Sequence, residues 1–293
     1  MGRPNHIGPR PLFSDWTQVT ERIRRADALV LFLDFDGTLV GFKQNPAEVR
    51  LDPSMRRLLA DIAENPRVRL VFISGRRRED LRRRVRIVNA AYIGLHGLER
   101  GAGVRLSAPS RVLMRRIGRG IREGIQHLDG VWLQDKVASL ALNYRGAPAA
   151  AAAKGRDVVN RALEADGAEL RILRGKKVWE ILAPEVKGKG AAAADVVRAA
   201  GDGPLAIYVG DDATDETAFA TLEGAITIRV GRCKSTLARY CVRDPNEVRV
   251  FLSRLSTILS VPGPGKANLS RLPMGERDSS CHARSHQRHE SAH

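Results

Sequence analysis

Cysteine is scarce in this sequence. The 293 residues include three, Cys233, Cys241 and Cys281, an odd number without the spacing of metal ligands. Their scarcity argues against a secreted domain held together by disulfides and against a cysteine-based metal site. It favours a reducing compartment.

Long apolar runs are also missing. No run approaches the roughly 20 residues that a membrane-spanning helix needs. The first six residues, Met-Gly-Arg-Pro-Asn-His, lack the apolar core of a secretory signal. With 43% hydrophobic and 28% charged residues, the composition is that of a globular protein. We therefore expect a cytoplasmic protein without a membrane partner.

Aromatic residues make up only 5% of the chain, whereas the formal net charge is +16. A strong basic charge often indicates nucleic-acid binding. Here the arginines form surface-like runs at 76–78 and 82–84 and recur in the C-terminal tail, without interleaved aromatic residues that could form a stacking platform. The pattern favours a solvated basic face that attracts anionic substrates, and it argues against nucleic acid as a partner.

The most informative stretch is an apolar run at residues 28–33 that ends in two carboxylates, Asp34 and Asp36, followed by Gly37 and Thr38. Its length and branching are typical of a strand buried on both faces of a parallel sheet. Side chains two positions apart on a strand point the same way, and parallel sheets bind ligands at the carboxyl ends of their strands. Two adjacent acids repel each other unless a cation lies between them, which predicts a Mg²⁺ site.

The apolar pattern divides the chain into parts. Strand-like and helix-like segments alternate over 13–104 and again over 185–260, which predicts one α/β core with a Rossmann-like parallel sheet. The intervening 105–184 reads as helix–strand–strand twice, which predicts an inserted α+β cap domain with antiparallel strands. Residues 1–12 are expected to form a loose leader, and 261–293 a disordered tail.

Polar clusters follow several predicted strands or open a helix. In an open parallel sheet such ends meet at one edge, so distant stretches of sequence can share a site. Carboxylates for a metal, a hydroxyl and an ammonium together suit a reaction on a phosphoryl group. Taken singly, Ser74 has the simpler interpretation of a turn residue, and Lys187 that of a surface residue. The clusters are Asp34 with Asp36, Ser74, Lys187, and Asp211 with Asp215.

As a set, and in this order, the clusters resemble the four motifs of the haloacid dehalogenase-like (HAD) phosphatase superfamily over roughly residues 25–260. The resemblance implies that Asp34 is the nucleophile and forms an aspartyl-phosphate. Asp36 would be the general acid and base. Ser74 and Lys187 would bind the phosphoryl oxygens.

The same resemblance implies a set of metal ligands. Mg²⁺ would be held by Asp34, by the backbone carbonyl of Asp36 and by Asp211. Asp212 and Asp215 would support the metal indirectly, through its ligands, and the sequence does not show which of the two matters more.

The insertion fits the α-β-β-α-β-β type of cap in that superfamily, and its charged residues resemble those of trehalose-6-phosphate phosphatases. Ammonium, guanidinium and carboxylate groups there would meet sugar hydroxyls and phosphate. Charged residues on exposed strands are usually just solvated, and Asn143 and Val186 depart from the usual residues of the family. The substrate-binding residues implied by the resemblance are Arg76, His96, Gly97, Glu99, Lys136, Arg145, Lys176 and Glu180.

The resemblance implies a Mg²⁺-dependent phosphatase that releases trehalose from trehalose 6-phosphate, with a trehalose-6-phosphate synthase as a candidate partner. One alternative is a phosphatase with the same cap type that acts on sucrose 6-phosphate or mannosyl-3-phosphoglycerate. Another is a catalytically silent regulatory domain. Such domains usually lose the nucleophile or a metal ligand, whereas Asp34, Asp36, Lys187 and Asp211 are all present here.

Overall fold

A computed structural model describes residues 8–41, 48–101, 106–165, 170–175, 177–201, 203–232 and 235–261. The predicted tail from residue 262 onward and the predicted sugar-binding Lys176 lie outside these residues. Among the residues described, no helix combines the length and the apolar character needed to cross a bilayer.

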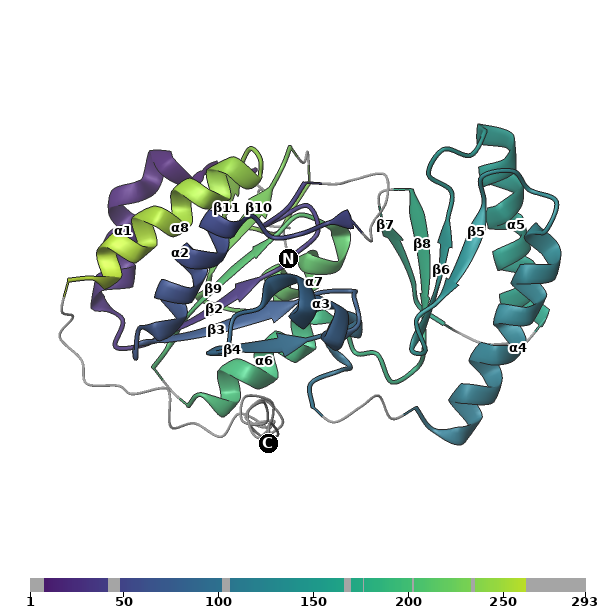
Figure 1. The fold of residues 1–293 in the computed structure, drawn as a ribbon, viewed down its shortest axis with the longest axis horizontal. Coiled ribbons are helices and arrows are strands. Elements are labelled where there is room, and N and C mark those ends of the chain that lie inside the picture. Colours follow the sequence, from purple (N-terminus) through teal and green to yellow (C-terminus); the bar gives the residue numbers. More distant parts are fainter. Residues whose placement is uncertain are drawn as a thin grey trace, which may run out of the picture.

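The larger of the two sheets has seven strands, and every pair of neighbouring strands in it is parallel (Figure 1). The apolar run predicted as a strand forms β2, which lies inside the sheet between β9 and β3. In spatial order the strands are β1 (Arg10–Pro11), β11 (Tyr240–Val242), β10 (Ile226–Val230), β9 (Leu205–Gly210), β2 (Leu29–Leu33), β3 (Val68–Ile73) and β4 (Ala90–Ile93).

Helices cover both faces of this sheet because successive residues of β2 point to opposite sides. Leu29, Leu31 and Leu33 pack into one apolar cluster, whereas Val30 and Phe32 belong to another on the opposite face. The first face carries α1 (Trp16–Arg25), α2 (Pro53–Glu64), α3 (Arg78–Val85) and α8 (Pro245–Leu259), and the second carries α6 (Lys189–Ala199) and α7 (Ala213–Thr221).

The second layer, here called the cap layer, comprises α4, β5, β6, α5, β7 and β8. Its four strands form an antiparallel sheet in the order β5-β6-β8-β7. One face packs on α4 and α5, and the other faces the core sheet (Figure 1). The bounds are α4 (Ala108–Ile125), β5 (Trp132–Asp135), β6 (Ser139–Asn143), α5 (Ala149–Ala165), β7 (Ile172–Gly175) and β8 (Val178–Leu182).

The structure differs from the sequence-based expectation at the amino-terminal edge. Arg10–Pro11 pair with Tyr240 and Cys241 as strand β1, and Leu12 is fully buried, so this part of the predicted leader is ordered. Strand β11 itself was not expected. Two- and three-residue strands carry too little apolar periodicity to be recognised from sequence.

Candidate active site

Asp34 lies directly after β2, at the carboxyl edge of the core sheet. Its backbone N–H donates to the carbonyl of Val209 at 3.0 Å, so it continues the pairing of β2 with β9. Its side chain is buried, and Thr38 Oγ1 lies 3.3 Å from Oδ2. Gly37 has φ 88°, a left-handed conformation that lets the chain turn back beside this carboxylate.

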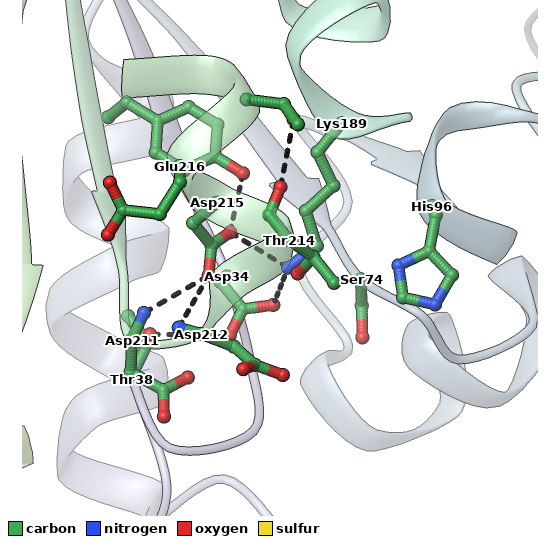
Figure 2. Close-up of polar contacts among 12 residues, drawn as sticks. Asp34, Thr38, Ser74, His96, Lys189, Asp211, Asp212, Thr214, Asp215 and Glu216 are labelled. Atoms are coloured by element: carbon green, nitrogen blue, oxygen red, sulfur yellow. Dashed lines mark hydrogen bonds and ion pairs between the residues drawn. The ribbon is translucent and has the colours of Figure 1, made fainter. Parts of the chain in front are cut away.

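The ammonium group of the site comes from Lys189 and not from the predicted Lys187. Lys189 Nζ lies 2.7 Å from Asp34 Oδ1 and 2.8 Å from Asp215 Oδ1, and its side chain is 3% exposed. Lys187 is exposed. Gly188 separates the two with φ 99°, so that α6 begins at Lys189. Side chains in a first helical turn lean back toward the helix N-terminus. Figure 2 shows the side chain of Lys189, the first residue of α6, reaching toward Asp34 and Asp215.

The Asp215 carboxylate accepts four hydrogen bonds from the residues around it. Its Oδ1 accepts hydrogen bonds from Lys189 Nζ and from the Tyr208 hydroxyl, both at 2.8 Å. Its Oδ2 accepts from the backbone N–H groups of Asp211 at 3.1 Å and Asp212 at 3.0 Å. A Cβ atom at residue 210 would lie 2.3 Å from Asp215, so Gly210 is required for the loop to come this close.

The burial of these charges decides their protonation. Desolvation raises the pKa of Asp34 well above its usual value; the Lys189 ammonium opposes this, and the carboxylates of Asp215 and Asp211 add to it. Burial alone would lower the pKa of Lys189, but Asp215 and Asp34 outweigh it and hold that pKa above the usual value. The raised pKa of Lys189 favours its charged form, beside the Asp34 carboxyl.

The carboxylates also provide oxygen donors for a cation. Ligand oxygens of Asp34, Asp211 and Asp215 lie within 4.8 Å of one another. Asp215 already accepts four hydrogen bonds, so Asp34 and Asp211 are the better candidates. The side chain of Asp212 accepts from Ala213 N at 2.6 Å and caps α7. A donor set made only of oxygens fits Mg²⁺.

Asp36 lies in a fork formed by Arg76. Arg76 Nε is 2.5 Å from Asp36 Oδ2 and Nη2 is 2.7 Å from Oδ1, while Nη1 reaches Asp80 Oδ2 at 3.0 Å. Arg76 was predicted to bind the substrate. In this structure its guanidinium contacts two carboxylates, those of Asp36 and Asp80.

Ser74 directly follows β3, and His96 and Gly97 lie in the loop after β4. Ser74 is 2% exposed, and its Oγ accepts from Arg76 N at 3.2 Å. His96 has φ 54° and ψ 32°, and its N–H donates to the Ser74 carbonyl at 3.0 Å. Gly97 abuts the start of α6, where a Cβ atom would lie 2.7 Å from that of Ala192. The need for a close backbone approach explains this glycine without a substrate.

The side chain of Glu180, on β8 of the cap layer, contacts a residue of the core, His96. Its Oε2 lies 2.9 Å from His96 Nε2, and its Oε1 accepts from Lys136 Nζ at 2.9 Å and Ser139 Oγ at 2.6 Å. Burial would raise the pKa of Glu180, but His96, Lys136 and these hydrogen bonds outweigh it and hold that pKa far below its usual value. Three predicted sugar-binding residues therefore bind one another here.

The remaining predicted sugar-binding residues are not gathered at this point. Glu99 is buried and its Oε2 accepts from the backbone N–H of Arg78 at 2.6 Å, so it fixes the start of α3. Arg145 is exposed just beyond the end of β6. Sequence reasoning missed Lys189, Ser139 and Tyr208; of these, Lys189 alone carried a signal, since it stands two residues from the lysine that was chosen.

Comparisons with known proteins fit this geometry. The sequence matches the family described as trehalose-phosphatase over residues 32–246. It is 28% identical over 292 residues to probable trehalose-phosphate phosphatase D of Arabidopsis thaliana, covering 86% of this chain and 78% of that protein. A solved trehalose-6-phosphate phosphatase related protein is 29% identical, with a TM-score of 0.65 over 78% of this chain and 97% of that one.

The structural likeness also extends to more distant proteins. The C-terminal domain of the C. albicans trehalose-6-phosphate phosphatase has a TM-score of 0.73 over 87% of this chain and 99% of that domain. Since only 19% of residues are identical, this match speaks for the fold alone. The predicted fold class, an α/β HAD core with a parallel sheet, is confirmed.

Proposed function

Because the chain belongs to the trehalose-phosphatase family, we propose that it hydrolyses trehalose 6-phosphate to trehalose and inorganic phosphate in a Mg²⁺-dependent reaction through an aspartyl-phosphate. The observation that carries this proposal is the surrounding of Asp34. The buried Asp34 carboxylate, at the edge of the sheet, contacts the buried Lys189 ammonium. The Asp211 carboxylate is close enough to Asp34 for both to bind one metal ion.

In the first step, an Asp34 oxygen attacks phosphorus and the bond from phosphorus to the sugar oxygen breaks. Asp36 donates a proton to the departing oxygen, so that trehalose leaves as a neutral alcohol. Both oxygens of Asp36 accept a hydrogen bond from Arg76 in this structure, so we expect Asp36 to turn away from Arg76 when it donates the proton.

In the second step, water attacks phosphorus of the aspartyl-phosphate, Asp36 takes the proton of that water, and Asp34 is regenerated as phosphate departs. Lys189 stabilises the phosphoryl oxygens in both steps, because its ammonium already lies within 2.7 Å of the attacking carboxylate. We propose that Ser74, which directly follows β3 and is 2% exposed, donates its hydroxyl hydrogen to a phosphoryl oxygen.

Asp34, the backbone carbonyl of Asp36 and Asp211 would hold Mg²⁺. The bound ion would neutralise charge on the phosphoryl group and relieve the repulsion between the two carboxylates. The structure adds a reason to leave Asp215 out of this set, since its four hydrogen bonds already fix the loop that carries Asp211.

Mg²⁺ is expected to raise the melting temperature of the protein. Anions that are crowded in the metal-free protein gain a shared cation, and a ligand that binds only the folded state stabilises it. Asp211→Ala should abolish this rise. Thermal melting in Mg²⁺ and in EDTA measures both. As a matched control, Asp61→Ala, at an exposed position of α2, should keep the full rise. Identical curves for the wild-type protein in Mg²⁺ and EDTA would contradict a metal site here.

For the sugar end, we propose that Glu180 and Lys136 on the cap layer bind the hydroxyls of trehalose. Both lie on the side of the small sheet that faces the core, as the contact between Glu180 and His96 requires. The sugar would take the place of His96 and Lys136 around the Glu180 carboxylate. Arg145 and Lys176 remain proposed contacts, Glu99 is proposed only to hold the loop, and Gly97 only to let it pack against α6.

Glu180→Ala is expected to reduce kcat/KM for trehalose 6-phosphate roughly ten- to hundredfold or more, since charge-assisted hydrogen bonds contribute about 1.5–3 kcal/mol each. Hydrolysis of para-nitrophenyl phosphate, which lacks the sugar, should stay near the wild-type rate. Steady-state kinetics with both substrates measures the difference. If both activities fell together, the loss of the contact between cap and core would be the cause, and Glu180 would not be a sugar-binding residue.

The experiment that tests the proposed function is phosphate release from a panel of esters, with and without EDTA. Trehalose 6-phosphate should give the highest kcat/KM, and EDTA should abolish release. A higher kcat/KM for sucrose 6-phosphate or mannosyl-3-phosphoglycerate would assign the other sugar. Absence of release from every ester would indicate a silent regulatory domain.

The proposed substrate implies an upstream reaction that joins glucose to glucose 6-phosphate. We therefore propose a trehalose-6-phosphate synthase as the enzyme that supplies this one, and the cytoplasm as the shared compartment. Co-expression followed by affinity purification would show whether the two also bind each other.

A further inference from the structure

Tyr208 is a buried polar group that the proposed mechanism does not use. It lies in the middle of β9 and is fully buried. Its ring stacks on Phe32, with centroids 5.8 Å apart, and meets Phe219 edge-on at 5.7 Å. A buried tyrosine needs a partner for its hydroxyl. Here the hydroxyl donates to Asp215 Oδ1 at 2.8 Å.

The oxygen that Tyr208 binds is the same one that receives Lys189. Asp215 Oδ1 therefore takes two donors, and Oδ2 takes the two backbone N–H groups of the loop that begins α7. Four donors from three directions leave the carboxylate a single orientation. That orientation places Lys189 Nζ at nearly equal distances from Asp215 (2.8 Å) and Asp34 (2.7 Å).

We propose that Tyr208 is a positioning residue for the phosphoryl-transfer step, acting through Asp215 on Lys189. The inference rests on the proposed function, in which Lys189 stabilises the phosphoryl oxygens. The Tyr208 hydroxyl holds Asp215 Oδ1 in place and satisfies part of the hydrogen-bonding capacity of this oxygen. The Lys189 ammonium is therefore shared between Asp215 and Asp34. Without the hydroxyl, Lys189 is the sole donor to Oδ1 and is drawn toward Asp215, away from the reacting group.

Tyr208→Phe tests this, because it removes one oxygen and keeps the ring that packs on Phe32 and Phe219. We expect kcat to fall roughly tenfold, the scale of one hydrogen bond to a charged group. The fall should be the same for trehalose 6-phosphate and para-nitrophenyl phosphate, with KM for trehalose 6-phosphate within about twofold of wild type, because Tyr208 acts on the transition state rather than on the sugar.

Tyr92→Phe is the matched control. Tyr92 is also buried, stacks on Phe72 with centroids 5.4 Å apart, and exchanges two hydrogen bonds with the backbone of Ile87, and neither partner belongs to the phosphoryl site. Its loss should lower the melting temperature and leave kcat unchanged. A Tyr208→Phe variant that behaved in the same way would show a merely structural role and overturn the inference.

Two further measurements complete the test. In an Asp215→Asn background, Tyr208→Phe should cause little additional loss of kcat, because both changes break one chain of contacts; full additivity would overturn the inference. Calorimetric binding of orthovanadate with Mg²⁺, a mimic of the transferring phosphoryl group, should weaken by about the same factor as kcat. This readout survives even if wild-type protein hydrolyses no ester, which would refute only the proposed function; unchanged vanadate affinity would refute the role of Tyr208.

Discussion

Lys189→Met is expected to abolish phosphate release, lowering kcat by at least roughly a hundredfold, the scale seen when one donor to a developing oxyanion is removed. Lys189 is the cation that touches Asp34 directly. It is also buried between two carboxylates, so its removal leaves uncompensated charge in the interior and should destabilise the fold by about 3–5 kcal/mol. Phosphate release and thermal melting, measured on the same preparation with Mg²⁺ present, report both effects.

Lys187→Met is the matched control, with the same chemical change two residues away. Lys187 is exposed, so its substitution should leave kcat near the wild-type value and change stability by no more than about 0.5 kcal/mol. The pair also decides between the sequence-based choice and the structure. Loss of activity in Lys187→Met with retention in Lys189→Met would show that the start of α6 is placed wrongly.

Asp34→Asn should remove turnover, leaving less than a hundredth of the wild-type rate, because an amide cannot form the acyl-phosphate. The same change should leave the melting temperature in EDTA unchanged or raise it. Burial lifts the pKa of Asp34 in the folded protein above its unfolded value, so the ionised carboxylate destabilises the fold increasingly as pH rises from the unfolded pKa toward the folded one. Asparagine removes that penalty at neutral pH.

Loss of activity together with retained or higher stability is therefore the signature of this site. Asp61→Asn, the same change on an exposed part of α2, should alter neither quantity. Residual turnover of Asp34→Asn above one hundredth of wild type would rule out Asp34 as the nucleophile. A large fall in melting temperature would show that its carboxylate is needed for folding.

The sequence predicted best where local pattern and chemistry coincide. The apolar run before Asp34 was predicted to be a strand buried on both faces of a parallel sheet, and it forms β2, between β9 and β3. The sequence-based prediction failed at Lys187 because both lysines of Lys-Gly-Lys-Gly are equally plausible in one dimension. The choice depends on the backbone turn at Gly188, whose φ of 99° decides which lysine begins the helix.

Contacts between residues far apart in the sequence also could not be predicted. The fork of Arg76 on Asp36 joins residues 40 positions apart, and the contact between Lys189 and Asp34 joins residues 155 positions apart. Strand order brings such residues together, but side-chain geometry decides which carboxylate receives which cation. Glu99 illustrates this, because a conspicuous acid beside the site turns out to bind a backbone N–H group.

The contact between His96 and Glu180 bears on how tightly the proposed sugar substrate can bind. Glu180 already binds an imidazole, an ammonium and a hydroxyl, so under the proposed function a sugar hydroxyl that binds this carboxylate competes with these groups. The expected affinity is then a difference between two sets of hydrogen bonds, those that the sugar makes with Glu180 and those that it replaces. Under the proposed function, a sugar ester therefore competes with groups of the protein itself for Glu180, whereas an ester without a sugar does not enter this exchange.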